Sequence, residues 1–261
     1  MAERNDLVRA ARDTMVRPES IQAAFLARRR SPEPGLIQDD ETLSWEVVDA
    51  RRMALASGLM SLILHPGMSC AVIAHPRRMT GLTLLAPLSC GARLVLIDAR
   101  AEHPLSLLLG PVERVESVER VEIAPVELAI VDDDRIAARL ATERPRGLRA
   151  VVHLAGGEGA GFVRSLPAVG ALGRTRLAHN DKDIEERFGA ETGHLATVVS
   201  AGGELRELQQ APQIDAFRDR PPDGERLLGA PIDDPATAAE IFAAWCLSGN
   251  ALDLRRDEGA R

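Results

Sequence analysis

Two glycine-rich stretches, each directly after a run of apolar residues, could approach a phosphate group through their backbone. Gly156–Gly161 (GGEGAG) follows the run 149–155, and Ser200-Ala201-Gly202-Gly203 follows the run 195–199. Glycines in such positions let backbone N–H groups come close to a bound phosphate. The glycines of the first stretch alternate instead of forming G-x-G-x-x-G, which favours a flexible turn. The second stretch lacks the lysine of a phosphate loop, and Arg206 is the nearest cation, so a plain turn stays open there too.

Residue spacing gives little support to metal binding or nucleophilic catalysis. The histidines show no H-x-x-x-H or H-E-x-x-H spacing, and no G-x-S-x-G elbow presents a serine. His153 lies in an apolar run, where a satisfied core or rim residue is expected. Asp132-Asp133-Asp134 could chelate a cation, but a turn that caps the following helix is the favoured interpretation. We therefore assign no catalytic residue and no metal ligand.

The composition excludes several classes of protein. A net charge of −7 and an aromatic content of 3% provide neither a basic field nor stacking platforms for nucleic acid. Cys70, Cys90 and Cys246 are odd in number and far apart, which favours buried free thiols in a reducing compartment. Residues 1–17 contain no apolar signal region, and the longest apolar runs, such as 59–64, are too short to span a bilayer. We expect a cytoplasmic protein without a membrane span.

Short apolar runs alternate with helical patterns over the middle of the chain. Strands are predicted at 69–74, 93–97, 127–131 and 149–155. Helices are predicted at 20–30, 44–64, 77–89 and 135–142, with Ser20 as the N-cap of the first and Pro87 shortening or kinking the third. Apolar strands that alternate with helices predict an α/β fold, with a mostly parallel sheet covered by helices on both faces.

The same patterns divide the chain into three parts. Residues 1–18 are polar and charged and are expected to form a flexible arm. Residues 19–160 are expected to form the α/β core. The alternation weakens after residue 156, so 161–261 is expected to be a less regular remainder. Within it, Ile241, Phe242 and Trp245 form an apolar cluster on a predicted helix. That cluster needs either a partner surface or a place on the chain's own sheet.

Three segments carry a resemblance to a known family. Thr42–Arg51 (TLSWEVVDAR) is similar to "T-L-T-Y-x-E-L-D-x-R", and His65-Pro66-Gly67 stands where that family has "x-P-G-D" before a strand. The run Pro76–Asp98 is similar to "A-x-x-x-A-G-A-x-x-V-P-L-D". This order and spacing resemble the adenylate-forming ligases, which include acyl-CoA synthetases, peptide-synthetase adenylation domains and luciferases. The resemblance implies the fold of their N-terminal subdomain.

The chemical motifs of these ligases are altered in this sequence. Their phosphate loop "Y-T-S-G-T-T-G-x-P-K-G" is matched best by Val199–Glu207, which has fewer hydroxyl side chains and contains Glu204 and Glu207. Trp245–Asn250 stands where the family has "W-x-x-T-G-D", so Asn250 replaces the aspartate that holds the ribose. The resemblance implies that a degenerate nucleotide site would consist of Ser200, Gly202, Gly203 and Asn250. It also implies that the family's C-terminal lid subdomain, with its catalytic lysine, is absent.

These features lead to one hypothesis with two alternatives. The first is a non-catalytic relative of the ligases that needs no cofactor and acts with a partner. That partner is a second copy, an intact ligase or an acyl carrier protein. The second is a minimal ligase that activates a carboxylic acid with ATP and Mg²⁺, alone or completed by another chain. The third is a doubly wound nucleotide-binding protein that uses Gly156–Gly161.

Overall fold

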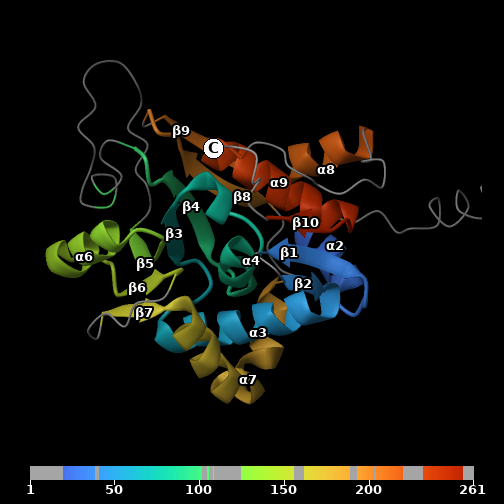
Figure 1. Cartoon of the computed structure of the whole chain (residues 1–261), viewed down its shortest axis with the longest axis horizontal. Helices are drawn as coiled ribbons and strands as arrows, with labels where there is room; N and C mark the ends of the chain where they lie inside the picture. The colour runs from blue at the N-terminus through green and yellow to red at the C-terminus, as the bar shows by residue number, and fades with distance from the viewer. Residues whose placement is uncertain are drawn as a thin grey trace, which may run out of the picture.

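A seven-stranded sheet forms the centre of the protein in the computed structural model (Figure 1). The structure describes residues 20–38, 41–101, 105, 108, 125–155, 162–188, 193–202, 204–219 and 232–254. The strand order is β7-β6-β5-β3-β4-β8-β9, and a second sheet has the order β10-β1-β2. The strands are β1 (Pro34–Gln38), β2 (Glu41–Ser44), β3 (Ser69–Ala74), β4 (Arg93–Asp98), β5 (Val126–Val131), β6 (Ala150–His153), β7 (Val163–Ser165), β8 (His194–Val199), β9 (Leu205–Gln209) and β10 (Leu252–Asp253).

The predicted parallel sheet is confirmed. β3 pairs in parallel with β4 on one side and with β5 on the other, and β6 continues the parallel arrangement beyond β5. β7 and β8 also run parallel to their inner neighbours, and only β9 is antiparallel. Strands from both sides of residue 160 therefore belong to one sheet. The expected arm, residues 1–18, lies outside the described residues.

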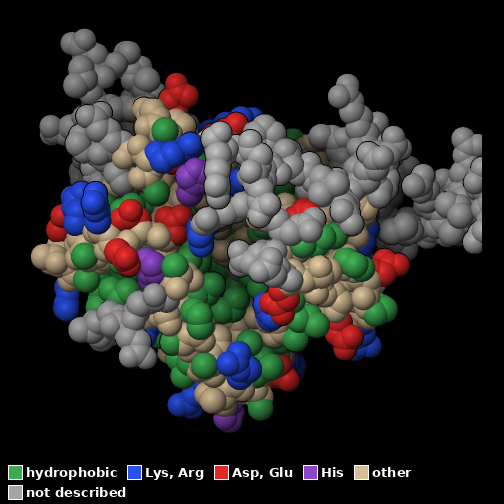
Figure 2. Space-filling model, viewed as in Figure 1, with side chains coloured by type: hydrophobic (Ala, Val, Ile, Leu, Met, Phe, Trp, Pro, Cys, Tyr) green, Lys and Arg blue, Asp and Glu red, His purple; other side chains and the backbone are tan. Residues whose placement is uncertain are grey.

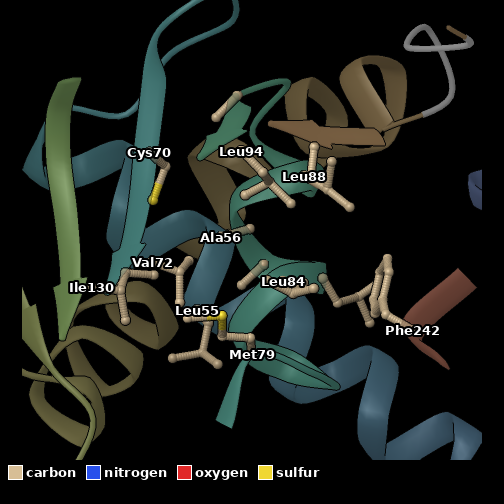
Figure 3. Packing of buried hydrophobic residues seen from close by; sticks show 14 of the residues in the cluster. Leu55, Ala56, Cys70, Val72, Met79, Leu84, Leu88, Leu94, Ile130 and Phe242 are labelled. Carbon is tan, nitrogen blue, oxygen red and sulfur yellow. The ribbon is translucent and has the colours of Figure 1, made fainter. Parts of the chain in front are cut away.

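Helices cover both faces of the sheet, as the alternation of patterns predicts. They are α2 (Ile21–Arg28), α3 (Trp45–Leu62), α4 (Leu82–Ser89), α6 (Asp134–Glu143), α7 (Leu166–Phe188), α8 (Gln210–Asp219) and α9 (Pro235–Ser248). On one face, Val72 and Ile130 pack with Leu55, Leu84 and Phe242, which come from α3, α4 and α9 (Figure 3). On the other face the core includes side chains of α6 together with strand residues, among them Ile73, Val131, Ile136 and Leu140.

The predicted helix at 77–89 is wrong in its first half. A short 3-10 helix, η1 (Pro76–Arg78), is followed by a break, and α4 begins only at Leu82. Gly81 has a φ of 57°, in the left-handed region that other residues rarely adopt, so the chain changes direction there. Pro87 lies inside α4 and does not end it. The predicted helices at 20–30, 44–64 and 135–142 are confirmed, with Ser20 as the N-cap of α2.

The apolar cluster of α9 packs against the protein's own core. Phe242 and Trp245 are fully buried, and the Trp245 ring stacks on Trp45 at 5.2 Å between centroids. The indole N–H of Trp245 donates to the carbonyl of Gly35 at 2.7 Å, which ties α9 to the small sheet. The cluster therefore packs within the protein itself and does not need a partner surface to cover it. Among the described residues, no helix combines the length and apolar character needed to cross a membrane.

Candidate functional site

The carboxyl ends of the parallel strands form the candidate site. In open parallel sheets, ligands bind at this edge, at the point where successive connections leave in opposite directions. Here β3 connects to β4 on one side, and β5 connects to β6 on the other, so that point lies between β3 and β5. The residues that follow these strands are His75 and Asp132. A ligand bound in the usual place would meet these two residues first.

Aspartate side chains of the protein itself accept the hydrogen bonds of the backbone N–H groups at this point. The Asp132 carboxylate accepts the backbone N–H of His75 at 2.9 Å and lies 3.9 Å from the Arg78 guanidinium. Asp133 caps α6 by accepting the N–H groups of Arg135 and Ile136 at 2.7 and 3.0 Å. The capping interpretation of this acidic run is therefore confirmed for Asp133. Among the described residues, no cluster of three or more ligands could hold a metal ion.

The predicted phosphate loop forms the tight turn of the β8–β9 hairpin. The Ser200 N–H donates to the Glu204 carbonyl at 3.0 Å, and the Glu204 N–H donates to the Ser200 hydroxyl at 3.2 Å. Both N–H groups are therefore bonded within the turn. A phosphate loop instead directs its N–H groups outward to the ligand. Gly203 and the stretch Gly156–Gly161 lie outside the described residues.

The cation nearest the end of β4 is paired with a buried carboxylate. The Arg100 guanidinium donates two hydrogen bonds to the Asp98 carboxylate, from Nε to Oδ1 at 3.0 Å and from Nη2 to Oδ2 at 2.7 Å. The hydrogen bond that Arg100 donates to Asp98 is the main cause that raises the pKa of Arg100. The same guanidinium donates to the Asp233 carbonyl and so joins β4 to the start of α9. Arg100 therefore serves a structural pair at this edge.

Asp234 occupies the N-terminus of α9. Its carboxylate accepts the N–H groups of Ala236 and Thr237 at 2.8 and 3.0 Å, and the Thr237 hydroxyl at 2.7 Å. Burial opposes the ionisation of Asp234, but the hydrogen bonds from Thr237 and Ala236 and the charge of Arg206 outweigh it and lower its pKa. A helix N-terminus binds anions through these same N–H groups. This one already holds a carboxylate of the chain.

Replacing Asp234 by alanine should lower the free energy of unfolding at pH 7 by about 1 kcal/mol, the usual loss for an N-cap. Because the folded pKa of Asp234 lies below its unfolded value, its stabilisation is complete above about pH 4 and is lost as the pH falls through the folded pKa. Urea unfolding at pH 7 and at acid pH measures this. Asp234→Asn, which keeps an acceptor, serves as the control. A loss from Asp234→Ala that stays equally large at acid pH would contradict the charged cap.

Asn250 lies at the other end of α9. It follows Gly249, which ends the helix with a φ of 72°, and Arg28 donates there to the carbonyls of Cys246 and Leu247. A helix of 14 residues is about 21 Å long. The Ser200 turn lies toward the Asp234 end, because β8 ends beside the end of β4, where Arg100 donates to the Asp233 carbonyl. The structure therefore places Ser200 and Gly202 together and Asn250 apart from them. Their role in binding a nucleotide stays a prediction.

His153 is more unusual than the sequence indicates. It ends β6, and its side chain is 5% exposed, so the expected buried position is confirmed. Its Nε2 lies 3.2 Å from a carboxylate oxygen of Asp134, yet neither ring nitrogen has a well-aligned hydrogen bond with a described residue. No sequence signal distinguishes such a histidine from one with satisfied nitrogens. His153 is thus a second imidazole at this edge of the sheet, in addition to His75.

Comparisons with known proteins show which solved structures share this fold. No protein-family model and no curated protein matches this sequence. Among solved structures, a long-chain-fatty-acid CoA ligase from Rhodopseudomonas palustris is 15% identical, with a TM-score of 0.58, over 91% of this chain and 58% of that one. An artificially fused adenylation–PCP di-domain from Klebsiella oxytoca is 15% identical, with a TM-score of 0.54, over 92% and 40%. The Bacillus subtilis O-succinylbenzoate CoA synthetase, solved with ATP and magnesium, is 11% identical, with a TM-score of 0.54, over 90% and 58%.

These likenesses establish the fold. The chain has the α/β fold of the adenylate-forming ligases over about nine-tenths of its length, which confirms the resemblance of Thr42–Arg51, His65–Gly67 and Pro76–Asp98 at the level of structure. The chain spans about half the length of these solved ligases.

Proposed function

We propose that this chain is a non-catalytic relative of the adenylate-forming ligases that acts through binding, as a partner in a complex. The observation that carries the proposal is the turn after β8, where the Ser200 N–H donates to the Glu204 carbonyl and the Glu204 N–H donates to the Ser200 hydroxyl. In a ligase-like fold this is the segment matched to the phosphate loop. Two of the N–H groups described in this turn are therefore already bonded within the chain and are not directed toward a triphosphate.

Charge at the same edge supports the proposal. Adenylation requires cations and N–H donors that clamp the triphosphate and stabilise charge on the transferring phosphoryl group. Here Asp133 and Asp234 cap two helices, and Asp98 holds Arg100. Glu204 and Glu207 are exposed beside the turn and would repel phosphate oxygens. These carboxylates thus occupy N–H donors and a cation that the reaction would need.

The purified chain, given ATP, Mg²⁺ and a panel of fatty, aromatic and amino acids, should show no carboxylate-dependent ATP–pyrophosphate exchange above the no-protein control. The Bacillus subtilis synthetase with O-succinylbenzoate serves as the positive control. Loss of the phosphate clamp alone should put the rate at least about a thousandfold below that control. Robust exchange by this chain alone would overturn the proposal.

A minimal ligase, alone or completed by another chain, is the alternative. The observation that favours it is the likeness to a synthetase solved with ATP and magnesium. The same assay distinguishes the two functions when the product of a neighbouring gene is added. Exchange that needs both proteins and a particular acid would support completion in trans. If that exchange also survives Ser200→Ala and Gly202→Asp, the catalytic site belongs to the added protein.

A further inference from the structure

Neighbouring elements at the carboxyl edge of the sheet carry an aspartate, a histidine and a serine. Asp134 is the first residue of α6, His153 ends β6, and Ser165 ends β7. β5, β6 and β7 are successive neighbours in the sheet, and α6 follows β5 (Figure 1). In Figure 2, a histidine side chain lies among acidic side chains on the side of the molecule where α6 lies. The fold therefore brings an acid, an imidazole and a hydroxyl together from three separate segments.

Asp134 determines which ring nitrogen of His153 carries a hydrogen. The His153 Nε2 lies 3.2 Å from the Asp134 carboxylate, which can only accept a hydrogen bond when it is ionised. The tautomer with its hydrogen on Nε2 is therefore favoured, and Nδ1 keeps a lone pair. The Nδ1 atom is buried, and no described residue donates a hydrogen bond to it. A buried imidazole with an unused lone pair is suited to act as a general base.

Ser165 lies next to this base in the sheet. β6 and β7 pair in parallel with His153 opposite Ser165, so the two side chains leave the same face of strands that lie about 4.8 Å apart. Ser165 is half-buried, and its hydroxyl oxygen accepts the N–H of Ala168 at 3.3 Å. That bond uses a lone pair of the oxygen, so the hydroxyl hydrogen can turn toward Nδ1. Hydrogen bonds of this kind often tighten only when a substrate is bound.

The start of α7 adds positive potential at Ser165. The helix begins at Leu166, directly after Ser165, and is 23 residues long. The N–H groups of its first turn form the positive end of the helix dipole. This end would stabilise negative charge that develops on a carbonyl oxygen held at Ser165. The helix N-terminus and the unpartnered His153 nitrogen are independent features that favour the same chemistry.

We propose that Ser165, His153 and Asp134 form a site that hydrolyses small activated esters and thioesters. This activity goes beyond the proposed function, which concerns adenylation at the turn after β8, and it uses none of the residues of that turn. Ser165 is the nucleophile and His153 is the general base, whereas Asp134 is a positioning residue that acts through His153. Because His153 is buried, the site takes short acyl groups such as acetyl.

The reaction consists of two balanced steps. The Ser165 oxygen attacks the acyl carbon, and its hydrogen passes to Nδ1 of His153. The bond between the acyl carbon and the leaving oxygen or sulfur breaks, and the leaving group takes that proton. Water then attacks the acyl-serine and passes a proton to His153, which returns it to the Ser165 oxygen as the carboxylic acid leaves. The sum is ester and water converted to acid and alcohol, or to acid and thiol.

The test uses p-nitrophenyl acetate with the purified full chain and without ATP. Peptide mass spectrometry should find an acetyl group on Ser165, and release of nitrophenolate should begin with a burst of about one equivalent. Ser165→Ala should abolish the burst, and His153→Gln should lower its rate about a hundredfold. Asp134→Asn should lower the rate less, and Asp134→Glu, which keeps the carboxylate, should recover part of that loss.

Two controls separate this site from the background reactivity of the surface. Ser61→Ala removes an exposed serine of α3 and His179→Gln an exposed histidine of α7, and neither should change the burst. Circular dichroism verifies the fold of each variant. If His153→Gln does not fold, Ser165→Cys keeps His153 and should be alkylated by iodoacetamide at least about tenfold faster than glutathione at pH 7.

Three results would overturn the proposal. They are the absence of acetyl on Ser165, a burst that survives Ser165→Ala, and an equal rate in a folded His153→Gln variant. Alkylation of Ser165→Cys no faster than glutathione would count in the same way. Because the assay contains no ATP, its result is independent of the pyrophosphate exchange that tests the proposed function.

Discussion

The Gly173→Ala variant is expected to be one of the most strongly destabilised single variants of this protein. A Cβ at Gly173 would lie 1.6 Å from the carbonyl oxygen of Ala54 and 2.6 Å from the backbone nitrogen of Gly58. Both are backbone atoms of α3, so no side-chain rotation can relieve the overlap. The helices would have to separate along their contact, and we expect a loss above about 4 kcal/mol, against a typical total stability of about 5–15 kcal/mol. Urea unfolding and the yield of soluble protein measure it.

Gly170, one turn earlier on α7, provides the matched control. A Cβ there would lie 3.4 Å from the Leu55 side chain, which is ordinary van der Waals contact. Alanine also has a higher helix propensity than glycine by about 1 kcal/mol. Gly170→Ala should therefore leave the free energy of unfolding unchanged or slightly raised. If Gly173→Ala and Gly170→Ala were equally stable, α3 and α7 would not be in the close contact described here.

Strands and helix caps are the features that the sequence predicts best. The runs at 69–74 and 93–97 are short, apolar and bounded by turn residues. Their secondary structure can therefore be predicted from residues nearby in the sequence. Ser20 likewise caps α2 through an N–H only three residues away. The break at Gly81 is a local feature that the apolar pattern conceals, because Leu82–Leu88 continues the helical period.

Features that depend on distant residues could not be predicted in this way. The apolar pattern of α7 is weak, because its closest contacts with α3 are at glycines such as Gly173, which add nothing to such a pattern. In the sheet, β8 pairs with β4, although more than 90 residues separate the two strands in the sequence. For the same reason Ser200 and Asn250, which the resemblance assigns to one site, lie toward opposite ends of α9.

Arg52 joins four helices from inside the core. Its side chain is fully buried, with Nε 2.7 Å from Asp49 and Nη1 3.1 Å from the Ser89 hydroxyl of α4. Nη2 lies 3.3 Å from Glu185 of α7. The guanidinium carbon lies 4.7 Å from the centre of the Phe188 ring of α7 and 5.5 Å from that of Phe25 of α2. The planar, five-donor arginine fork allows all of these contacts at once.

Replacing Arg52 by alanine should lower the free energy of unfolding by about 3–5 kcal/mol. Removing one member of a buried charged network leaves the remaining polar groups without their partner. Here the Ser89 hydroxyl, itself buried, loses its donor, and Asp49 loses its counter-ion. Arg52→Lys should recover only part of the loss, because an ammonium cannot reach these partners with fork geometry while lying over the Phe188 ring. Urea unfolding of both variants measures this.

Arg51, the preceding residue on α3, makes the comparison specific. It is a surface arginine paired with Glu41, and its side chain is 44% exposed, so Arg51→Ala should change stability by less than about 0.5 kcal/mol. The Arg52 network also holds the last turn of α7, through Glu185 and Phe188, while Gly173 holds its middle. Hydrogen exchange in Arg52→Ala should therefore increase at the end of α7 before it increases in β3. Exchange that rises uniformly over the sheet would show that Arg52 supports the whole core and not the placement of α7.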